Sequence, residues 1–401
     1  MTALTRELIR RLPKTDLHLH LDGSLRLSTL IEMARAMKVE MPSGTEAGLR
    51  ETVFRDHYAD LGEYLHGFKY TCAVLRNAEN LERAAQELAE DNQAEGVRYI
   101  EVRFAPQLHA YGDLDTVEVL RAVDRGLRRA KDAFNRRPGI AGGAEPPFDY
   151  GIIACAMRYF DARFSAFHRA FMESHSYSPP DRVYGLATME LVRAAERARD
   201  GHGVPVVGID LAGPEDGYPP RDHREAYRYA HRRFFRKTVH AGEAYGPESV
   251  FQAITELHAE RIGHGTLMLD PGAIRSKAIV DRDDYVRDLA QFVADRRITI
   301  EVCLTSNQQT NPAFRRLEDH PFRKMMEHKL SVTLCTDNRL VSNTTVTDEM
   351  VKAVTTFGLG VDDVKHLIVY GFKRSFCPGE YAVKREYVRR CMDYFESLVG
   401  S

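Results

Sequence analysis

The stretch Thr15-Asp-Leu-His-Leu-His-Leu-Asp-Gly23 has the pattern of a buried strand that ends in polar groups. Its apolar part, 16–21, is the first of eight short apolar runs along the 401 residues. Strands that are apolar at nearly every position are typical of a parallel sheet covered on both faces. The predicted strands are 16–21, 97–104, 150–157, 204–211, 235–240, 261–263, 298–304 and 332–335.

Segments with apolar residues three and four positions apart separate these runs, and 80–95 and 284–295 are the clearest of them. Eight alternations of strand and helix predict a closed (β/α)8 TIM barrel, as a single domain over 1–401. The segment 28–70 is long for one connection and is expected to form extra helices, a lid, over the end of the first strand. Two further segments, 135–147 and 174–181, are predicted surface loops.

Composition limits the classes of partner. The net charge of −2 gives no electrostatic reason to expect binding to nucleic acid or to an anionic membrane. No run of 18 apolar residues exists, and the charged stretch 1–14 lacks the apolar core of a secretory signal. None of the six cysteines forms a C-x-x-C pair, so free thiols in a reducing compartment are expected. These features predict a cytoplasmic protein.

Polar side chains follow the predicted strands at the end where barrel active sites lie. The first strand ends in His18 and His20, which point to the same side because they are two positions apart. The fifth ends in His240 and the eighth in Asp337. Three imidazoles and one carboxylate suit a single zinc ion with a position left for water. A lone histidine at such a place is more often a core residue, and it is the combination that favours a metal site.

Other strand ends supply candidates for chemistry and binding. Glu243, three residues after His240, is a candidate general acid or base, although a carboxylate at a helix N-terminus is the alternative. His264 lies between two glycines and either acts on substrate or only hydrogen-bonds to the site. Gly213 either lets a ligand approach the backbone or is an ordinary loop glycine. Arg158 ends the third strand and is a predicted substrate-binding residue.

Taken together, these residues resemble the adenosine deaminase family of the amidohydrolase superfamily. The matching segments are 15–23, Ile209-Asp-Leu-Ala-Gly213, Thr238-Val-His-Ala-Gly-Glu243, Arg261-Ile-Gly-His-Gly265, Glu301-Val-Cys303 and Thr336-Asp-Asn338. The resemblance implies that one Zn²⁺ per chain is held by four residues, namely His18, His20, His240 and Asp337. It also implies that Glu243 protonates purine N1 and that His264 orients and deprotonates the water on the zinc.

The resemblance further implies substrate contacts. Gly213 would donate its backbone N–H to purine N3, and Asp22 would contact the ribose 5′-hydroxyl. Four residues on one helical face are the expected lid, with plain core packing as the alternative: Leu61, Tyr64, Leu65 and Phe68. The family often has two consecutive aspartates after the eighth strand, whereas this chain has Asn338 as the second. An amide always carries N–H donors, so Asn338 is expected to bind the acceptor N7.

The expected activity is hydrolytic deamination of adenosine, and of 2′-deoxyadenosine, to inosine and ammonia in purine salvage. Adenine, AMP and a conjugate such as aminodeoxyfutalosine are alternative substrates, and an inactive nucleoside-binding barrel is the alternative without catalysis. A zinc deaminase that acts on nucleic acid would need a P-C-x-x-C motif, which is absent. A binuclear hydrolase would need a bridging ligand, typically a lysine, at the fourth strand end, where Asp210-Leu-Ala-Gly213 stands instead. The oligomeric state is left open.

Overall fold

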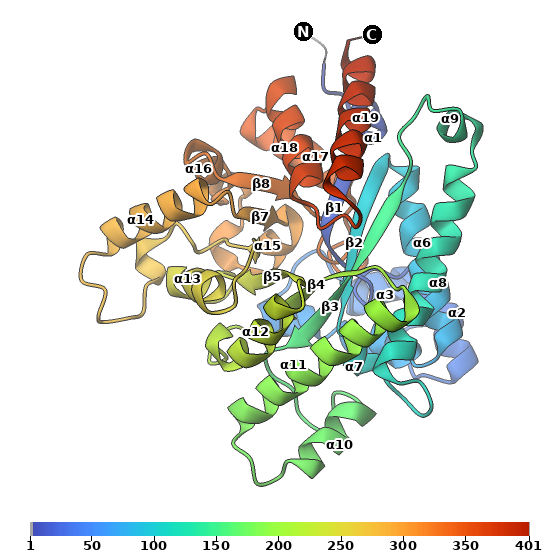
Figure 1. Ribbon diagram of the computed structural model, residues 1–401, viewed down its shortest axis with the longest axis vertical. Helices are drawn as coiled ribbons and strands as arrows, with labels where there is room; N and C mark the ends of the chain where they lie inside the picture. Colours follow the sequence, from blue (N-terminus) through green and yellow to red (C-terminus); the bar gives the residue numbers. More distant parts are fainter. Residues whose placement is uncertain (1–2, 401) are drawn as a thin grey trace.

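Eight parallel strands, each hydrogen-bonded to the next in chain order, form the centre of the molecule, with helices around them (Figure 1). The computed structural model describes residues 3–400. The strands are β1 Lys14–His20, β2 Val97–Phe104, β3 Asp149–Met157, β4 Val206–Ala212, β5 Arg236–Ala241, β6 Arg261–His264, β7 Thr299–Val302 and β8 Ser331–Leu334. This arrangement confirms the predicted (β/α)8 barrel.

The first and last strands meet just beyond the end of β8, through the backbone of Asp337. The N–H of His20 donates to the carbonyl of Asp337 at 2.7 Å, and the N–H of Asp337 donates to the carbonyl of His18 at 2.8 Å. These two bonds form a parallel bridge between β1 and the segment after β8. The seam of the barrel is therefore made by residues that were predicted to hold a metal.

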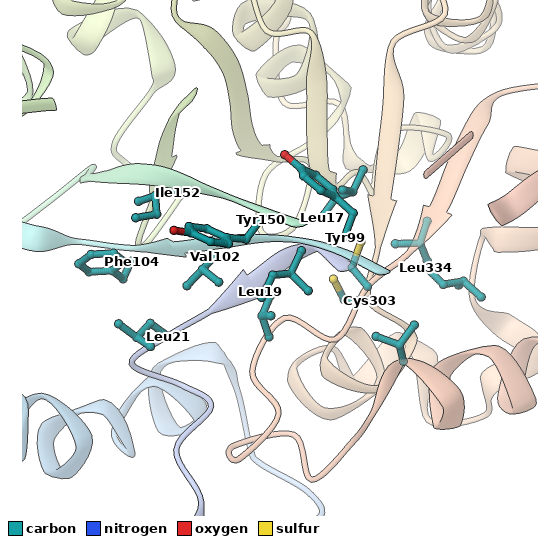
Figure 2. Close-up of a cluster of buried hydrophobic side chains, with 14 of the residues drawn as sticks. Leu17, Leu19, Leu21, Tyr99, Val102, Phe104, Tyr150, Ile152, Cys303 and Leu334 are labelled. Atoms are coloured by element: carbon teal, nitrogen blue, oxygen red, sulfur yellow. The ribbon is translucent and has the colours of Figure 1, made fainter. Parts of the chain in front are cut away.

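The strands are buried along their length, which explains their continuous apolar pattern. Every residue of β1 and β2 is buried, and side chains from these strands and from β3 gather in one apolar cluster (Figure 2). Burying apolar surface on both faces of the sheet is the main stabilising contribution to such a barrel. A second, smaller cluster packs under the β3–α11 connection and contains Phe160, Val183, Tyr184 and Ala187.

Helices of very different lengths connect the strands. The α-helices are α1 Arg6–Arg11, α2 Leu27–Met37, α3 Glu46–Thr52, α4 Leu61–Leu65, α5 Phe68–Val74, α6 Ala78–Ala94, α7 Pro106–His109, α8 Thr116–Asn135, α9 Pro138–Ala141, α10 Ala166–Ser174, α11 Pro180–Glu196, α12 Arg224–Arg232, α13 Pro247–Glu256, α14 Arg282–Asp295, α15 Leu304–Thr310, α16 Phe322–Glu327, α17 Val346–Phe357, α18 Val361–Arg374 and α19 Tyr381–Val399. Shorter helical turns are η1 Arg197–Gly201, η2 Pro220–His223, η3 Pro271–Ala273, η4 Pro312–Phe314 and η5 Leu317–Asp319.

The structure corrects the predicted elements in three places. The seventh strand ends at Val302, because Leu304 already begins α15. The expected lid helix is two short helices, α4 and α5, since the chain is interrupted around Gly67. The predicted loop 135–147 contains the single turn α9. All six cysteines are free, and among residues 3–400 no helix is both long and apolar enough to cross a membrane.

Candidate active site

A cavity of about 380 Å³ opens at the C-terminal ends of the strands. Twelve of the fourteen residues singled out from the sequence line it: His20, Asp22, Leu61, Tyr64, Leu65, Phe68, Gly213, His240, Glu243, His264, Asp337 and Asn338. The two that do not are His18, which is fully buried beneath the cavity, and Arg158. The lid residues of α4 and α5 therefore face the same space as the predicted metal ligands.

The four predicted metal ligands converge on one point. Nε2 of His20 lies 3.3 Å from Nε2 of His240 and 3.5 Å from Oδ1 of Asp337. Nε2 of His18 also lies 3.5 Å from Oδ1 of Asp337 and has no hydrogen-bond partner although it is buried. Burial alone would raise the pKa of Asp337, but the histidine rings around it, His18 above all, hold it well below its usual range. A cation accounts for this arrangement better than hydrogen bonds do, because it satisfies all four donor atoms.

Carboxylates behind two of these histidines fix their tautomers. Nδ1 of His18 lies 2.9 Å from Glu301, and Nδ1 of His240 lies 3.0 Å from Asp210. A carboxylate only accepts, so each Nδ1 carries the hydrogen and each Nε2 presents a bare lone pair to the site. Arg103 joins both carboxylates, with Nη1 at 3.0 Å from Asp210 and Nη2 at 2.8 Å from Glu301. This buried network orients the ligands before any ion arrives.

Three residues at the site adopt the left-handed backbone region. Asp337 has φ +60°, His264 has φ +64° and Gly213 has φ +100°. A non-glycine residue in this region is strained unless its surroundings hold it there. At Gly213 an added Cβ would lie 3.4 Å from Met157, which is ordinary van der Waals contact. Glycine is therefore required there by the backbone conformation and not by a lack of space. The strand ends are thus turned so that these groups face the cavity.

The surroundings of Glu243 favour the protonated form of its carboxyl. Burial raises the pKa of its carboxyl to about 8, and the negative charges of Asp337 and Glu215 act in the same direction. Its Oε1 lies 3.8 Å from Nε2 of His264. A carboxyl that keeps its proton at pH 7 can donate it to a substrate atom in the cavity.

The loop that carries Glu243 is held by a second carboxylate, that of Glu215. Its two oxygens accept the backbone N–H groups of four consecutive residues, 242–245, at 2.8–3.0 Å, together with the hydroxyl of Ser249. Glu215 is itself only 4% exposed. A carboxylate that accepts this many charge-assisted hydrogen bonds fixes the path of the backbone after β5.

Asn338 is held between the lid and β1. Its Nδ2 donates to the hydroxyl of Tyr64 at 2.8 Å, and that hydroxyl lies 2.7 Å from Oγ of Ser342. A Cβ on Gly23 would lie 1.8 Å from Oδ1 of Asn338, so glycine is needed there to make room for the amide. Tyr64 is therefore a polar contact within the site as well as an apolar part of the lid.

Asp22 stands where the family resemblance places the ribose, and one oxygen of its carboxylate is available to accept a hydrogen bond. Oδ2 lies 3.4 Å from Nε2 of His109, whereas Oδ1 is buried without a hydrogen-bond partner. Arg158 lies outside the cavity lining, where its Nη1 donates to the carbonyl of Tyr218 at 2.7 Å and its Nη2 to that of His240. It supports the end of β5 and does not contact the cavity.

Several supporting residues were not assigned roles from the sequence. Asp210 and Glu301 stand inside otherwise apolar strands, and this is the signal that could have identified them, because an isolated carboxylate in a buried strand must have a partner. Glu215 and Asn307 stand outside strands and offer no such signal. Nδ2 of Asn307 lies 2.9 Å from Nδ1 of His264.

The fold and the site define the class: a (β/α)8-barrel hydrolase with a buried cluster of histidines and a carboxylate at its strand ends that could hold a metal ion. The chain belongs to the adenosine deaminase family, whose model matches residues 13–168 and 183–390. The adenosine deaminase of Mycobacterium ulcerans is 35% identical over 374 residues, covering 93% of this chain and 92% of that protein. That of Mycolicibacterium vanbaalenii is 36% identical over 378 residues, covering 94% and 93%.

Solved structures of deaminases share the fold. The N6-mAMP deaminase of Arabidopsis has a TM-score of 0.71 at 26% identity, covering 98% of this chain and 99% of that one. An Arabidopsis protein complexed with IMP has a TM-score of 0.73 at 26% identity, covering 98% and 100%. The adenine deaminase of Arthrobacter aurescens has a TM-score of 0.73 at 22% identity, covering 96% and 99%, and supports the fold alone.

Proposed function

We propose that the protein is a zinc-dependent deaminase that converts adenosine and 2′-deoxyadenosine, with water, to inosine or 2′-deoxyinosine and ammonia. The observation that carries this proposal is that the buried carboxyl of Glu243, whose pKa is raised, lines the same cavity as three of the four proposed metal ligands, with the fourth directly beneath it. The ligands would be His18, His20, His240 and Asp337. Their nitrogen and carboxylate donors suit zinc, and His18 presents a bare, buried Nε2 that only a cation or a donor can satisfy.

When bound, zinc supplies a water molecule whose pKa falls from 15.7 towards ~7, and hence a nucleophile at neutral pH. Glu243 donates its proton to purine N1, which makes the adjacent C6 more electrophilic. His264 lies beside Glu243 and orients the attacking oxygen. After the oxygen adds to C6, one proton of the water passes to the amino group, which leaves as ammonia, and the other restores the proton of Glu243.

The remaining cavity residues would position the nucleoside. Asp22 accepts a hydrogen bond from the ribose 5′-hydroxyl through its unpaired Oδ1, and the backbone N–H of Gly213 donates to N3. Asn338 donates to N7 with the hydrogen that Tyr64 does not use. The apolar side chains of α4 and α5 exclude water from the reacting base, which strengthens these hydrogen bonds.

A nucleoside 5′-monophosphate is the second candidate substrate. Lys69 and Arg76 stand at the mouth of the cavity, both exposed, and neither forms an ion pair with another residue of 3–400. The relative of known structure that binds IMP supports this candidate. The carboxylate of Asp22 opposes it, because an anion at the ribose end repels a phosphate while it accepts from a hydroxyl. The unphosphorylated nucleoside is therefore preferred.

A substrate panel tests the proposal. The values of kcat/KM for adenosine, 2′-deoxyadenosine, adenine, AMP and aminodeoxyfutalosine are compared on protein loaded with one zinc per chain. We expect adenosine and 2′-deoxyadenosine to exceed the others. A higher value for AMP that falls selectively on Lys69→Ala and Arg76→Ala would reject the nucleoside in favour of the nucleotide. A cytoplasmic location and a single domain over 1–401 stay predictions.

A further inference from the structure

We propose that Asn307 and His320 are positioning residues that place the ring hydrogen of His264 on Nε2, so that this ring donates a hydrogen bond into the cavity. The catalytic consequence rests on the function proposed above, whereas the position of the hydrogen does not. His264, Asn307 and His320 come from the end of β6, from α15 and from the segment before α16. Each is buried, with 1–2% of its surface exposed.

Four groups form a continuous line of hydrogen bonds. The backbone N–H of Phe322 lies 3.1 Å from Nδ1 of His320. Nε2 of His320 lies 3.2 Å from Oδ1 of Asn307. Nδ2 of Asn307 lies 2.9 Å from Nδ1 of His264, whose Nε2 faces the cavity near Glu243.

The direction of the whole line follows from its first member. A backbone N–H can only donate, so Nδ1 of His320 is an acceptor and carries no hydrogen. Burial also lowers the pKa of His320 to about 3, which keeps its ring neutral with the single hydrogen on Nε2. That hydrogen needs an acceptor, so the oxygen of the Asn307 amide faces His320 and its NH₂ faces His264. Nδ1 of His264 is therefore an acceptor too, and its hydrogen is on Nε2.

If the hydrogen bonds along this line ran in the opposite direction, two N–H donors would face each other. If the amide of Asn307 were turned over, its NH₂ would face the hydrogen on Nε2 of His320. Moving that hydrogen to Nδ1 would oppose it to the N–H of Phe322, the first residue of α16. Neither group can turn to water in so buried a place, and an unpaired buried donor is costly.

With its hydrogen on Nε2, His264 differs from the proposed metal ligands, which present a bare Nε2 to the site. Nδ1 of His18 and of His240 faces a carboxylate, which leaves Nε2 bare, whereas Nδ1 of His264 faces an N–H donor. Ligand atoms of His18, His240, His264 and Asp337 all lie within 4.8 Å of one another, so distance alone would admit His264 as a ligand. A nitrogen that carries a hydrogen cannot coordinate a metal. It also cannot accept a proton from water, so we infer that neutral His264 stabilises the attacking oxygen as a donor and does not deprotonate it.

Nuclear magnetic resonance of the histidine rings tests the position of the hydrogen without any assay of activity. The protein carries ¹⁵N only in histidine, and the His264 signals are assigned by their loss in His264→Asn. We expect Nδ1 of His264 to show the shift of a nitrogen without hydrogen, and Nε2 that of a nitrogen bonded to hydrogen, before and after zinc is added. The opposite assignment, or a zinc-induced shift typical of coordination at Nε2, would overturn the proposal.

Asn307→Asp reverses the polarity of the line at nearly constant shape. A carboxylate accepts from both rings, so Nδ1 of His264 should gain a hydrogen and its signal should move accordingly. Asn311→Asp is the matched control, because Oδ1 of Asn311 only caps the backbone N–H of Ala313 and an aspartate does the same. In hydrolases an inverted histidine tautomer can cost up to about 10⁴ in kcat. We expect Asn307→Asp to lower kcat at least about tenfold with little change in KM, and Asn311→Asp to leave both unchanged.

His320 supplies a second test should Asn307→Asp fail to fold. His320→Gln keeps an N–H donor that can reach Asn307, while His320→Leu removes it and leaves the amide free to turn. We expect His264 to retain its hydrogen on Nε2 in the glutamine variant and to show a mixture of tautomers in the leucine variant. An unchanged Nε2 signal in both would overturn the role of His320. If adenosine is not a substrate but His264 carries its hydrogen on Nε2, the proposed function fails and the placement of the hydrogen stands.

Discussion

Glu215→Gln tests whether the loop that carries Glu243 depends on one buried carboxylate. Oε2 of Glu215 accepts three backbone N–H groups, and Oε1 accepts that of Gly242, at 2.8 Å, and the hydroxyl of Ser249. A glutamine whose oxygen takes the Oε2 position keeps the three bonds. Its NH₂ can still donate to Ser249, but it faces the N–H of Gly242, which loses its acceptor.

The expected loss of stability follows from this one unpaired N–H donor. A buried N–H left unpaired costs about 1–3 kcal/mol. Unfolding entropy of about 2.1 cal/mol/K per residue gives roughly 0.8 kcal/mol/K for this chain, so Tm should fall by about 1–4 °C. The loop should also move, and a misplaced catalytic group can cost about 10² in rate. Because the charge of Glu215 contributes to the raised pKa of Glu243, its removal should lower that pKa.

The assay measures Tm, kcat, KM and the pH profile of kcat/KM for the wild type and for Glu215→Gln. Glu225→Gln is the control, since Glu225 is a largely exposed partner of Arg228 and Arg224 on α12. We expect the control to match the wild type. In Glu215→Gln we expect a lower Tm, a lower kcat and a basic limb at lower pH. A kcat/KM within twofold of wild type at every pH would show that the loop keeps its place without this carboxylate.

Three further predictions concern the site itself. Elemental analysis should find one zinc per chain, and His18→Ala or Asp337→Ala should lose both metal and activity; two metals per chain at full activity would contradict the ligand set. Glu243→Gln should keep the metal while kcat falls by ~10²–10⁴. Wild-type activity should fall as pH rises through a value no higher than about 8, because the raised pKa of Glu243 keeps its carboxyl protonated below that value. A bound cation would lower this pKa, so the fall can occur at lower pH. Glu243→Gln should lack this limb, and an active variant would place the proton donor elsewhere. Asn338→Ala should raise the activation barrier by about 1–3 kcal/mol with adenosine and by little with 7-deazaadenosine. An equal increase with the two substrates would mean that Asn338 does not contact N7 and that its role is the hydrogen bond to Tyr64.

Much of the fold could be predicted because the strands of a barrel carry a strong local signal. The run 97–104 coincides with β2, and the other runs lie within two residues of the observed strand bounds. The candidate ligands followed from the same signal, since a strand end fixes where a polar side chain lies. The position of a residue at a strand end does not determine which way its side chain points, however. Arg158 stands at its predicted strand end, but its guanidinium donates to two backbone carbonyls and does not line the cavity.

The parts that could not be predicted depend on contacts between distant segments. The helical periodicity of 61–68 does not reveal that Gly67 divides the lid into α4 and α5. Glu215 reaches a loop thirty positions away in the chain, and no periodic pattern connects the two. The hydrogen on His264 depends on residues 307 and 320 together, and the composition of any one segment carries no information on it.

The backbone of Asp337 closes the barrel while its side chain belongs to the proposed ligand cluster, which bears on how the protein matures in the cell. Two of the four proposed ligands belong to the first strand and one to the segment after the last, so a nascent chain could not assemble the proposed centre until residue 337 has left the ribosome. If the proposed ligand set is right, an incomplete chain would bind a metal ion less tightly, because it offers at most three of the four groups. Binding of the proposed zinc would thus depend on completion of the barrel, because the residue that closes the sheet also supplies one of the proposed ligands.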